Sequence, residues 1–150
     1  MELFTVLAGL GVFIASVFIS YAMIKQEVNE DARQIESLLE REDHELDVKQ
    51  AMLVSLLTTI SLGAIFNSYS ALVFPIVYIC MRVALFNKLL NKKLNWPIYY
   101  LSLRGFDAWL HKMFPNPEEL LMFYKVVLIA GLAISYIISM ALGLIGRIIA

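Results

Sequence analysis

Two short groups of residues in this sequence have types and spacing that could bind a metal or transfer protons. His44 has Glu40 and Asp47 at positions i−4 and i+3, which places three potential metal ligands on one helix face. His111 follows Asp107 by four residues, but acid–base catalysis there also needs a nucleophile or a bound substrate group, and none is evident. Both arrangements are typical of a solvated helix face, so we expect no metal site and no catalytic residue.

Other signatures of catalysis or cofactor binding are missing as well. One cysteine, Cys80, rules out a disulfide framework and a Cys-based zinc site, and we expect a buried thiol or a palmitoylated one. The sequence has no glycine-rich phosphate loop, no Gly-x-Ser-x-Gly and no His-Glu-x-x-His. No histidine lies in a long apolar stretch, as an intramembrane haem would require. We therefore expect a protein that is not an enzyme and has no cofactor.

Composition indicates a membrane protein. Of the 150 residues, 60% are hydrophobic and 17% are charged, whereas soluble domains carry about 25% charged residues. A formal net charge of −1 argues against nucleic acid as a partner, because nucleic-acid-binding domains are usually basic. The length suits a single membrane domain over residues 1–150.

Long stretches without charges predict the membrane spans. Residues 3–24 and 50–81 hold no charged side chain, and 126–150 holds only Arg147. Because about 20 apolar residues cross about 30 Å of hydrocarbon, we predict an all-α integral membrane protein, a helical bundle with three to four transmembrane or re-entrant helices. The predicted segments are a span over 3–24, a cytoplasmic acidic helix over 25–49, a helical hairpin or long span over 50–87, a basic aromatic interfacial loop over 88–116, and a span over 117–149.

The middle stretch decides the topology. A polar cluster at Asn67–Ser70, followed by Pro75, divides it into two arms of 16 residues, 51–66 and 71–86. A hairpin places eleven Lys and Arg residues on one side of the membrane, whereas a single span divides the same residues seven against four. Because Lys and Arg concentrate on the cytoplasmic side, we favour the hairpin, with both termini outside a bacterial inner membrane.

The predicted cytoplasmic helix is acidic and amphipathic. Residues 25–49 carry nine Asp or Glu against four Lys or Arg. Val28, Ala32, Ile35 and Leu39 form an apolar stripe at helical spacing. Such a stripe needs a covering surface, which is the chain's own second loop, a partner protein or a neighbouring copy.

The second loop has the opposite charge. Residues 82–112 carry six basic side chains against Asp107, interleaved with aromatic residues. Rings at the headgroup level with cations toward anionic lipid are typical of an interfacial segment, so we expect membrane lipids as partners. The expected lipid-contacting residues are Lys88, Lys92, Lys93, Trp96 and Trp109.

Small or weakly polar residues recur at every fourth position in the predicted spans. They are Ala51, Ser55, Thr59 and Gly63 in the middle stretch, and Gly131, Ser135, Ser139 and Gly143 in the last. This spacing lets helix backbones approach closely, within one protomer or between protomers. A polar-lined path for ions or water is the alternative, although conducting paths usually carry intramembrane ionisable groups.

These features predict a non-enzymatic integral membrane subunit. We expect a scaffold or channel-forming component of an oligomeric inner-membrane complex of the secretion or transport type. Its expected partners are other copies of the chain, other membrane subunits, or both. The alternatives are a holin-like pore-forming protein, favoured by the short hairpin arms and their polar turn, and a membrane immunity or exclusion protein.

Overall fold

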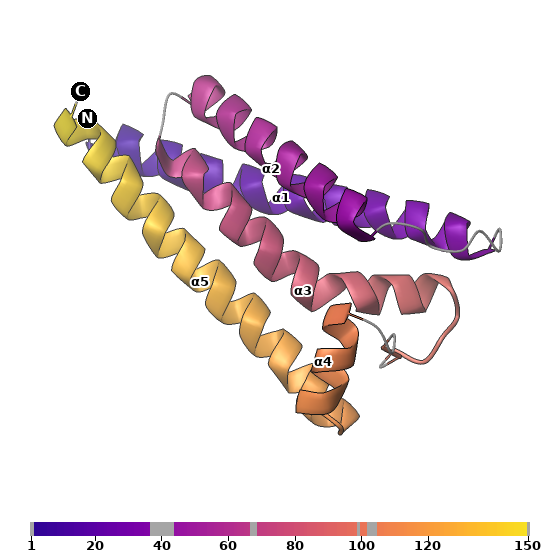
Figure 1. Cartoon of the computed structure of the whole chain (residues 1–150). Helices are drawn as coiled ribbons and strands as arrows, with labels where there is room; N and C mark the ends of the chain where they lie inside the picture. The colour runs from indigo at the N-terminus through magenta and orange to yellow at the C-terminus, as the bar shows by residue number, and fades with distance from the viewer. Residues whose placement is uncertain (1, 37–43, 67–68, 99, 102–104, 150) are drawn as a thin grey trace.

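All the secondary structure in the described residues is helical (Figure 1). The structure, a computed structural model, describes residues 2–36, 44–66, 69–98, 100–101 and 105–149. In chain order the helices are α1 (Glu2–Glu36), α2 (His44–Phe66), the 3₁₀ helix η1 (Tyr69–Val73), α3 (Phe74–Lys93), α4 (Gly105–Met113) and α5 (Pro117–Ile149).

Three segments of the structure are long and apolar enough to cross a membrane. They are Leu7–Arg33 in α1, Tyr69–Lys93 across η1 and α3, and Pro117–Gly143 in α5. A shorter apolar helix covers Met52–Ile65 in α2. Each of the three exceeds the length of about 20 residues that a span needs. They confirm the predicted all-α membrane bundle, and the chain is an integral membrane protein.

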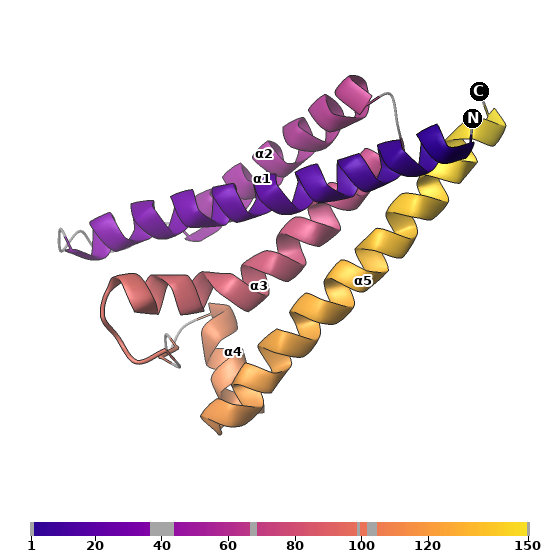
Figure 2. The ribbon, with the colours of Figure 1, turned by 180° about the vertical axis from the view of Figure 1, so that it is seen from behind.

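The helices alternate in direction along the chain. Figures 1 and 2 show α1 and α3 running one way and α2 and α5 running back, so that the two ends of the chain lie together. From that end α1 and α5 diverge, with α3 between them. The bundle therefore has a narrow end, which holds the termini, and a wide end, where α4 lies beside the start of α5.

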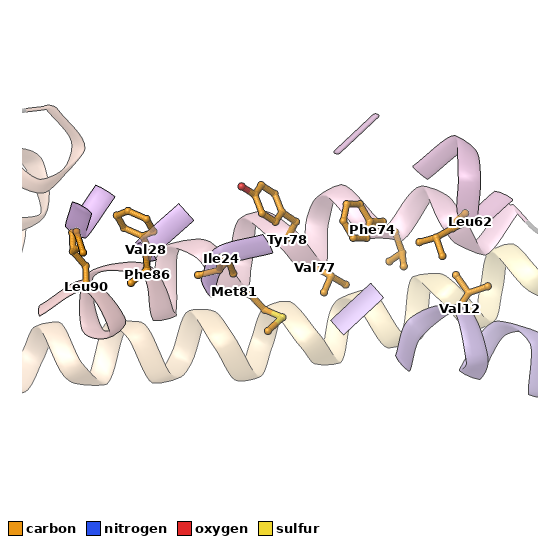
Figure 3. Close-up of a cluster of buried hydrophobic side chains, with 13 residues drawn as sticks. Val12, Ile24, Val28, Leu62, Phe74, Val77, Tyr78, Met81, Phe86 and Leu90 are labelled. Atoms are coloured by element: carbon orange, nitrogen blue, oxygen red, sulfur yellow. The ribbon is translucent and has the colours of Figure 1, made fainter. Parts of the chain in front are cut away.

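The main core lies between α1 and α3. On α1 a buried side chain recurs at every fourth residue, at Val12, Ser16, Ser20, Ile24, Val28 and Ala32. That spacing forms one ridge along the helix. Figure 3 shows Val12 and Phe74 at one end of the cluster, and Val28 with Phe86 and Leu90 at the other. The ridge of α1 therefore packs along the whole length of α3.

Local sequence explains two of the helix starts. Pro75 lies in the first turn of α3, where the N–H that proline lacks would have no helical partner. Before α5, the carbonyl of Asn116 accepts a hydrogen bond from the N–H of Leu120 at 3.1 Å, and its side-chain amide donates to Glu119 at 2.9 Å. Glu118 and Glu119 in the first turn also interact favourably with the helix dipole.

Several helix ends differ from the boundaries of the predicted segments. α1 continues without a break from the predicted span into the acidic range and ends at Glu36. Residues 37–43, which include Leu39, lie outside the described residues, as do Asn67 and Ser68 of the expected turn. α2 begins within the predicted acidic range, at His44. Within the predicted loop over 88–116, α3 ends at Lys93 and α4 forms a further helix.

Candidate functional site

Polar side chains inside an apolar bundle cost free energy, so they usually serve a function or a specific packing contact. At the narrow end, the hydroxyl of Ser70 on η1 donates to the carbonyl of Ser139 on α5 at 2.8 Å. The hydroxyl of Ser139 in turn donates to the carbonyl of Gly9 on α1 at 3.1 Å. This chain of bonds, the serine cluster, joins three elements that lie far apart in the sequence.

Two further serines lie in the same bundle without such bonds. Ser20 on α1 and Ser135 on α5 are fully buried, and neither hydroxyl has a hydrogen-bond partner in the described part of the chain. Ser16, one turn before Ser20, donates to the carbonyl of Val12 at 2.8 Å. A buried hydroxyl without a partner costs free energy. The small volume of serine, which permits close packing of helices, offsets part of that cost.

The helices α3 and α5 approach each other closely at Gly131. A Cβ atom built on Gly131 would lie 2.4 Å from the Sγ of Cys80 and 2.6 Å from its Cβ. Carbon atoms in ordinary contact lie about 3.5–4.0 Å apart. Only glycine therefore fits at position 131 with α3 in its present place, and Cys80 packs directly against the α5 backbone.

A charged cluster joins α1 to α3 on the wide-end side. The Nε of Arg82 lies 2.8 Å from the Oε2 of Glu27, and the hydroxyl of Tyr78 donates to the other carboxylate oxygen. The Arg82 guanidinium lies 4.8 Å from the centre of the Phe86 ring, a cation–π contact. Glu27 and Arg82 are 25% and 36% exposed. The carboxylate of Glu27 therefore links α1 to two side chains of α3.

Two asparagines on α3 hold the segment between α3 and α5. The side-chain amide of Asn91, which is 2% exposed, donates to the carbonyls of Ile98 and Tyr100 at 3.1 and 2.8 Å. Asn87 donates to Asp107 at the start of α4 at 2.9 Å. Both the turn after α3 and the first turn of α4 are therefore fixed against the same stretch of α3.

The expected lipid-contacting residues lie in and around this fixed segment. Lys88, Lys92, Lys93, Trp96 and Trp109 are all exposed to the surroundings of the protein. The ammonium group of Lys93 also donates to the side chain of Asn29 on α1. With the bond between Arg82 and Glu27, this contact brings the basic second loop against the acidic end of α1 within one chain.

The predicted small-residue stripes lie mostly inside the protomer. On α5, Gly131, Ser135 and Ser139 are buried and Gly143 is half-buried. On α2, Ser55 and Thr59 are buried, Gly63 is half-buried, and the side chain of Ala51 lies outside the described residues. The hydroxyl of Thr59 donates to the carbonyl of Ser55 at 2.8 Å. The α5 stripe faces the chain's own helices, as the contacts of Gly131 and Ser139 establish.

The stripe of the predicted partner-binding arm also packs within the chain. Val28 and Ala32 are almost fully buried in the core, and Ile35 packs against it. Leu39 lies outside the described residues. In Figure 3, Val28 lies beside Phe86 and Leu90, which belong to α3 and to the range 82–112 of the predicted second loop.

Of the two candidate chemical groups, the described residues include only His111 with Asp107. No cluster of three or more potential metal-binding side chains occurs in the part of the chain that the structure describes. The side chains of His44, Glu40 and Asp47 lie outside that part. His111 is exposed, while Asp107 accepts a hydrogen bond from Asn87.

Sequence reasoning missed the residues that make the polar contacts at the wide end. They are Glu27, Tyr78, Asn87 and Asn91. A usable signal exists for the first, because Glu27 and Arg82 carry opposite charges just beyond the ends of two charge-free stretches, 3–24 and 50–81. Asn87 and Asn91 recur at i and i+4, which places them on one helix face.

Comparison with known proteins identifies no relative. No protein family matches this sequence, and no curated protein or solved structure matches it either.

Proposed function

We propose that this chain is a non-enzymatic integral membrane subunit that acts as a scaffold in an oligomeric inner-membrane complex of the secretion or transport type. The observation that carries the proposal is the position of α2 at the edge of the bundle. Among its residues 52–65, only Ser55, Thr59 and Leu62 are buried. The large apolar side chains exposed on α2 are Met52, Leu53, Val54, Leu56, Leu57, Ile60 and Ile65.

The length of α2 supports a protein neighbour over lipid alone. Its apolar part, Met52–Ile65, is about 21 Å long at 1.5 Å per residue, against about 30 Å of hydrocarbon. An apolar stretch this short is accommodated when the bilayer thins, when flanking polar side chains reach the surface, or when the helix packs against other helices. We therefore assign its exposed face to a membrane-spanning helix of another subunit, either a second copy or a different protein.

Site-specific photo-crosslinking tests this assignment. A photo-reactive amino acid at position 57, in place of Leu57 on α2, should give a discrete protein adduct in native membranes. The matched control is position 129 on α5, where Ile129 is also exposed and should give no discrete adduct. Mass spectrometry of the adduct, after purification in a mild detergent, identifies the partner. Absence of an adduct at position 57, or equal adducts at both positions, would refute the proposal.

The serines of the bundle favour a channel-forming component as the second candidate. Ser20 and Ser135 place in the interior two hydroxyls that have no hydrogen-bond partner among the described residues. Water or ions could bind to them if the helices separate. Under this alternative, which includes a holin-like pore, vesicles containing the chain should lose a potassium gradient faster than empty vesicles. Ser135→Val should slow the loss. Vesicles that keep their gradient leave the scaffold as the better assignment.

The charges support an orientation with both termini outside. The alternating helices place the basic end of α3 at the wide end of the bundle, opposite the termini (Figure 2). Under the positive-inside rule the wide end faces the cytoplasm. Protease added to spheroplasts should therefore remove a tag from either terminus. Protection of both tags would reverse the orientation.

A further inference from the structure

The segment between α3 and α5 must lie at one membrane surface. It connects the end of one candidate span, at Lys93, with the start of another, at Pro117. α4 packs beside the first turns of α5, since Leu110 is buried in a cluster with Leu120, and Phe114 stacks on Phe123 at 4.6 Å. The turn and α4 therefore lie at the level where lipid headgroups begin.

This surface carries cations and aromatic rings together. The residues concerned, the cationic–aromatic patch, are Lys88, Lys92, Trp96, Tyr100, Trp109 and Lys112, and all of them are exposed. Lys88 and Lys92 share one face of α3 at i and i+4. The rings of Trp96 and Tyr100 meet edge to face at 4.8 Å between centres. Apolar side chains are exposed beside them, at Ile98 and Met113.

Hydrogen bonds from two asparagines of α3 hold the segment that carries the patch. Asn91 holds the carbonyls on either side of the turn, at residues 98 and 100, and Asn87 holds α4. Both asparagines lie on the stretch of α3 that also carries Lys88 and Lys92, so the turn with Trp96 and Tyr100 and the start of α4 are both tied to that stretch. The backbone that carries the patch is therefore held to α3.

The charge of the patch indicates which class of molecule it binds. No carboxylate among the described residues pairs with Lys88, Lys92 or Lys112, and the nearby Asp107 binds Asn87. Three cations next to exposed rings complement a negatively charged headgroup above an acyl chain. We propose that the cationic–aromatic patch is a binding site for anionic phospholipid headgroups. This proposal does not depend on the scaffold role of α2.

The two tryptophans of the chain make the site directly testable. Trp96 and Trp109 are the only tryptophans, and both belong to the patch. Brominated lipids quench tryptophan fluorescence on contact, so quenching by brominated phosphatidylglycerol and phosphatidylcholine in mixed vesicles measures the relative affinity of the patch for each. Each lysine near an anionic surface contributes about fivefold in affinity. We expect at least a fivefold preference for phosphatidylglycerol.

Charge variants separate a defined site from general attraction. Lys88→Gln with Lys92→Gln should abolish most of the preference, whereas Lys88→Arg with Lys92→Arg should retain it. The matched control is Lys25→Gln with Lys125→Gln, two exposed lysines on α1 and α5 outside the patch. This control should keep the preference. Circular dichroism establishes that each variant retains its helices.

Three outcomes would overturn the proposal. Equal quenching by the two lipids would exclude a preference for anionic headgroups. An equal loss in the patch variant and in the control variant would show diffuse electrostatics instead of a site. Relief of quenching by soluble glycerophosphate would assign the patch to a free phosphate compound rather than to lipid.

Discussion

Gly131→Ala is the sharpest test of the packing between α3 and α5. The added methyl carbon would lie 2.4 Å from Sγ and 2.6 Å from Cβ of Cys80. A change of side-chain rotamer at Cys80 moves Sγ but leaves Cβ where the α3 backbone holds it. The clash therefore persists in every rotamer, and the two helices must separate by about 1 Å to restore a contact of about 3.5 Å.

The cost of this separation can be estimated from known overpacking effects. Extra methylene-sized groups in a packed core cost about 1–3 kcal/mol, and a clash that no rotamer relieves belongs at the upper end. Alanine recovers about 1 kcal/mol through its higher helix propensity. We expect Gly131→Ala to lower the free energy of unfolding by about 2 kcal/mol, measured by denaturation with sodium dodecyl sulfate in mixed micelles.

A double-mutant cycle with Cys80 identifies the cause. Cys80→Gly removes both clashing atoms and should restore the stability of Gly131→Ala relative to the Cys80→Gly single variant. Cys80→Ala removes only Sγ and should restore part of it. Cys80→Ser keeps an atom at both positions and should restore little. A coupling energy of about 2 kcal/mol lies within the range for residues in direct contact.

Gly9→Ala is the matched control on α1. A Cβ atom there would lie 3.1 Å from the terminal methyl of Met140, which is the flexible end of a long side chain and can move away. We expect a much smaller loss than at Gly131. Equal stability of Gly131→Ala and the natural chain, or failure of Cys80→Gly to rescue, would refute the packing of α3 against α5 at this position.

Three other contacts give further predictions. Glu27→Ala leaves Arg82 without its carboxylate and should lower the free energy of unfolding by about 1–2 kcal/mol, between the values for exposed and buried pairs. In the same unfolding assay, exchanging the two charges should recover part of the loss. Ser139→Ala removes the hydrogen bond to the Gly9 carbonyl and should lower the free energy of unfolding by about 0.6 kcal/mol. A loss above about 2 kcal/mol would contradict the loss of a single hydrogen bond. Asn91→Ala frees two carbonyls, so hydrogen exchange in the turn after α3 should accelerate while exchange in α1 stays unchanged; an unchanged turn would contradict the anchoring role of Asn91.

The membrane class of this protein was predictable because it depends on local composition. Long stretches without charges indicate helices that cross a bilayer, whatever their neighbours are. The start of α5 is equally local, because Asn116, Pro117 and Glu118 are residues that favour the first turn of a helix at those positions.

The contacts between helices were not predictable in the same way. A stripe such as Gly131, Ser135 and Ser139 indicates that one face packs closely, but its spacing does not say against which helix. Cys80 lies opposite Gly131, and Arg82 opposite Glu27, at separations of about 50 residues in the chain. Many pairings of four apolar helices satisfy the same stripes, and only their three-dimensional arrangement selects one.

The sequence by itself determined that this chain is helical and lies in a membrane, because hydrocarbon admits only segments that satisfy their own backbone hydrogen bonds. It also determined the acidic and basic ends of the spans. Only the tertiary structure decided that α3 covers the apolar stripe of α1, that the α5 stripe packs inside the protomer, and that α2 remains at the edge. These are matters of close contact between side chains, on which helix association in lipid depends.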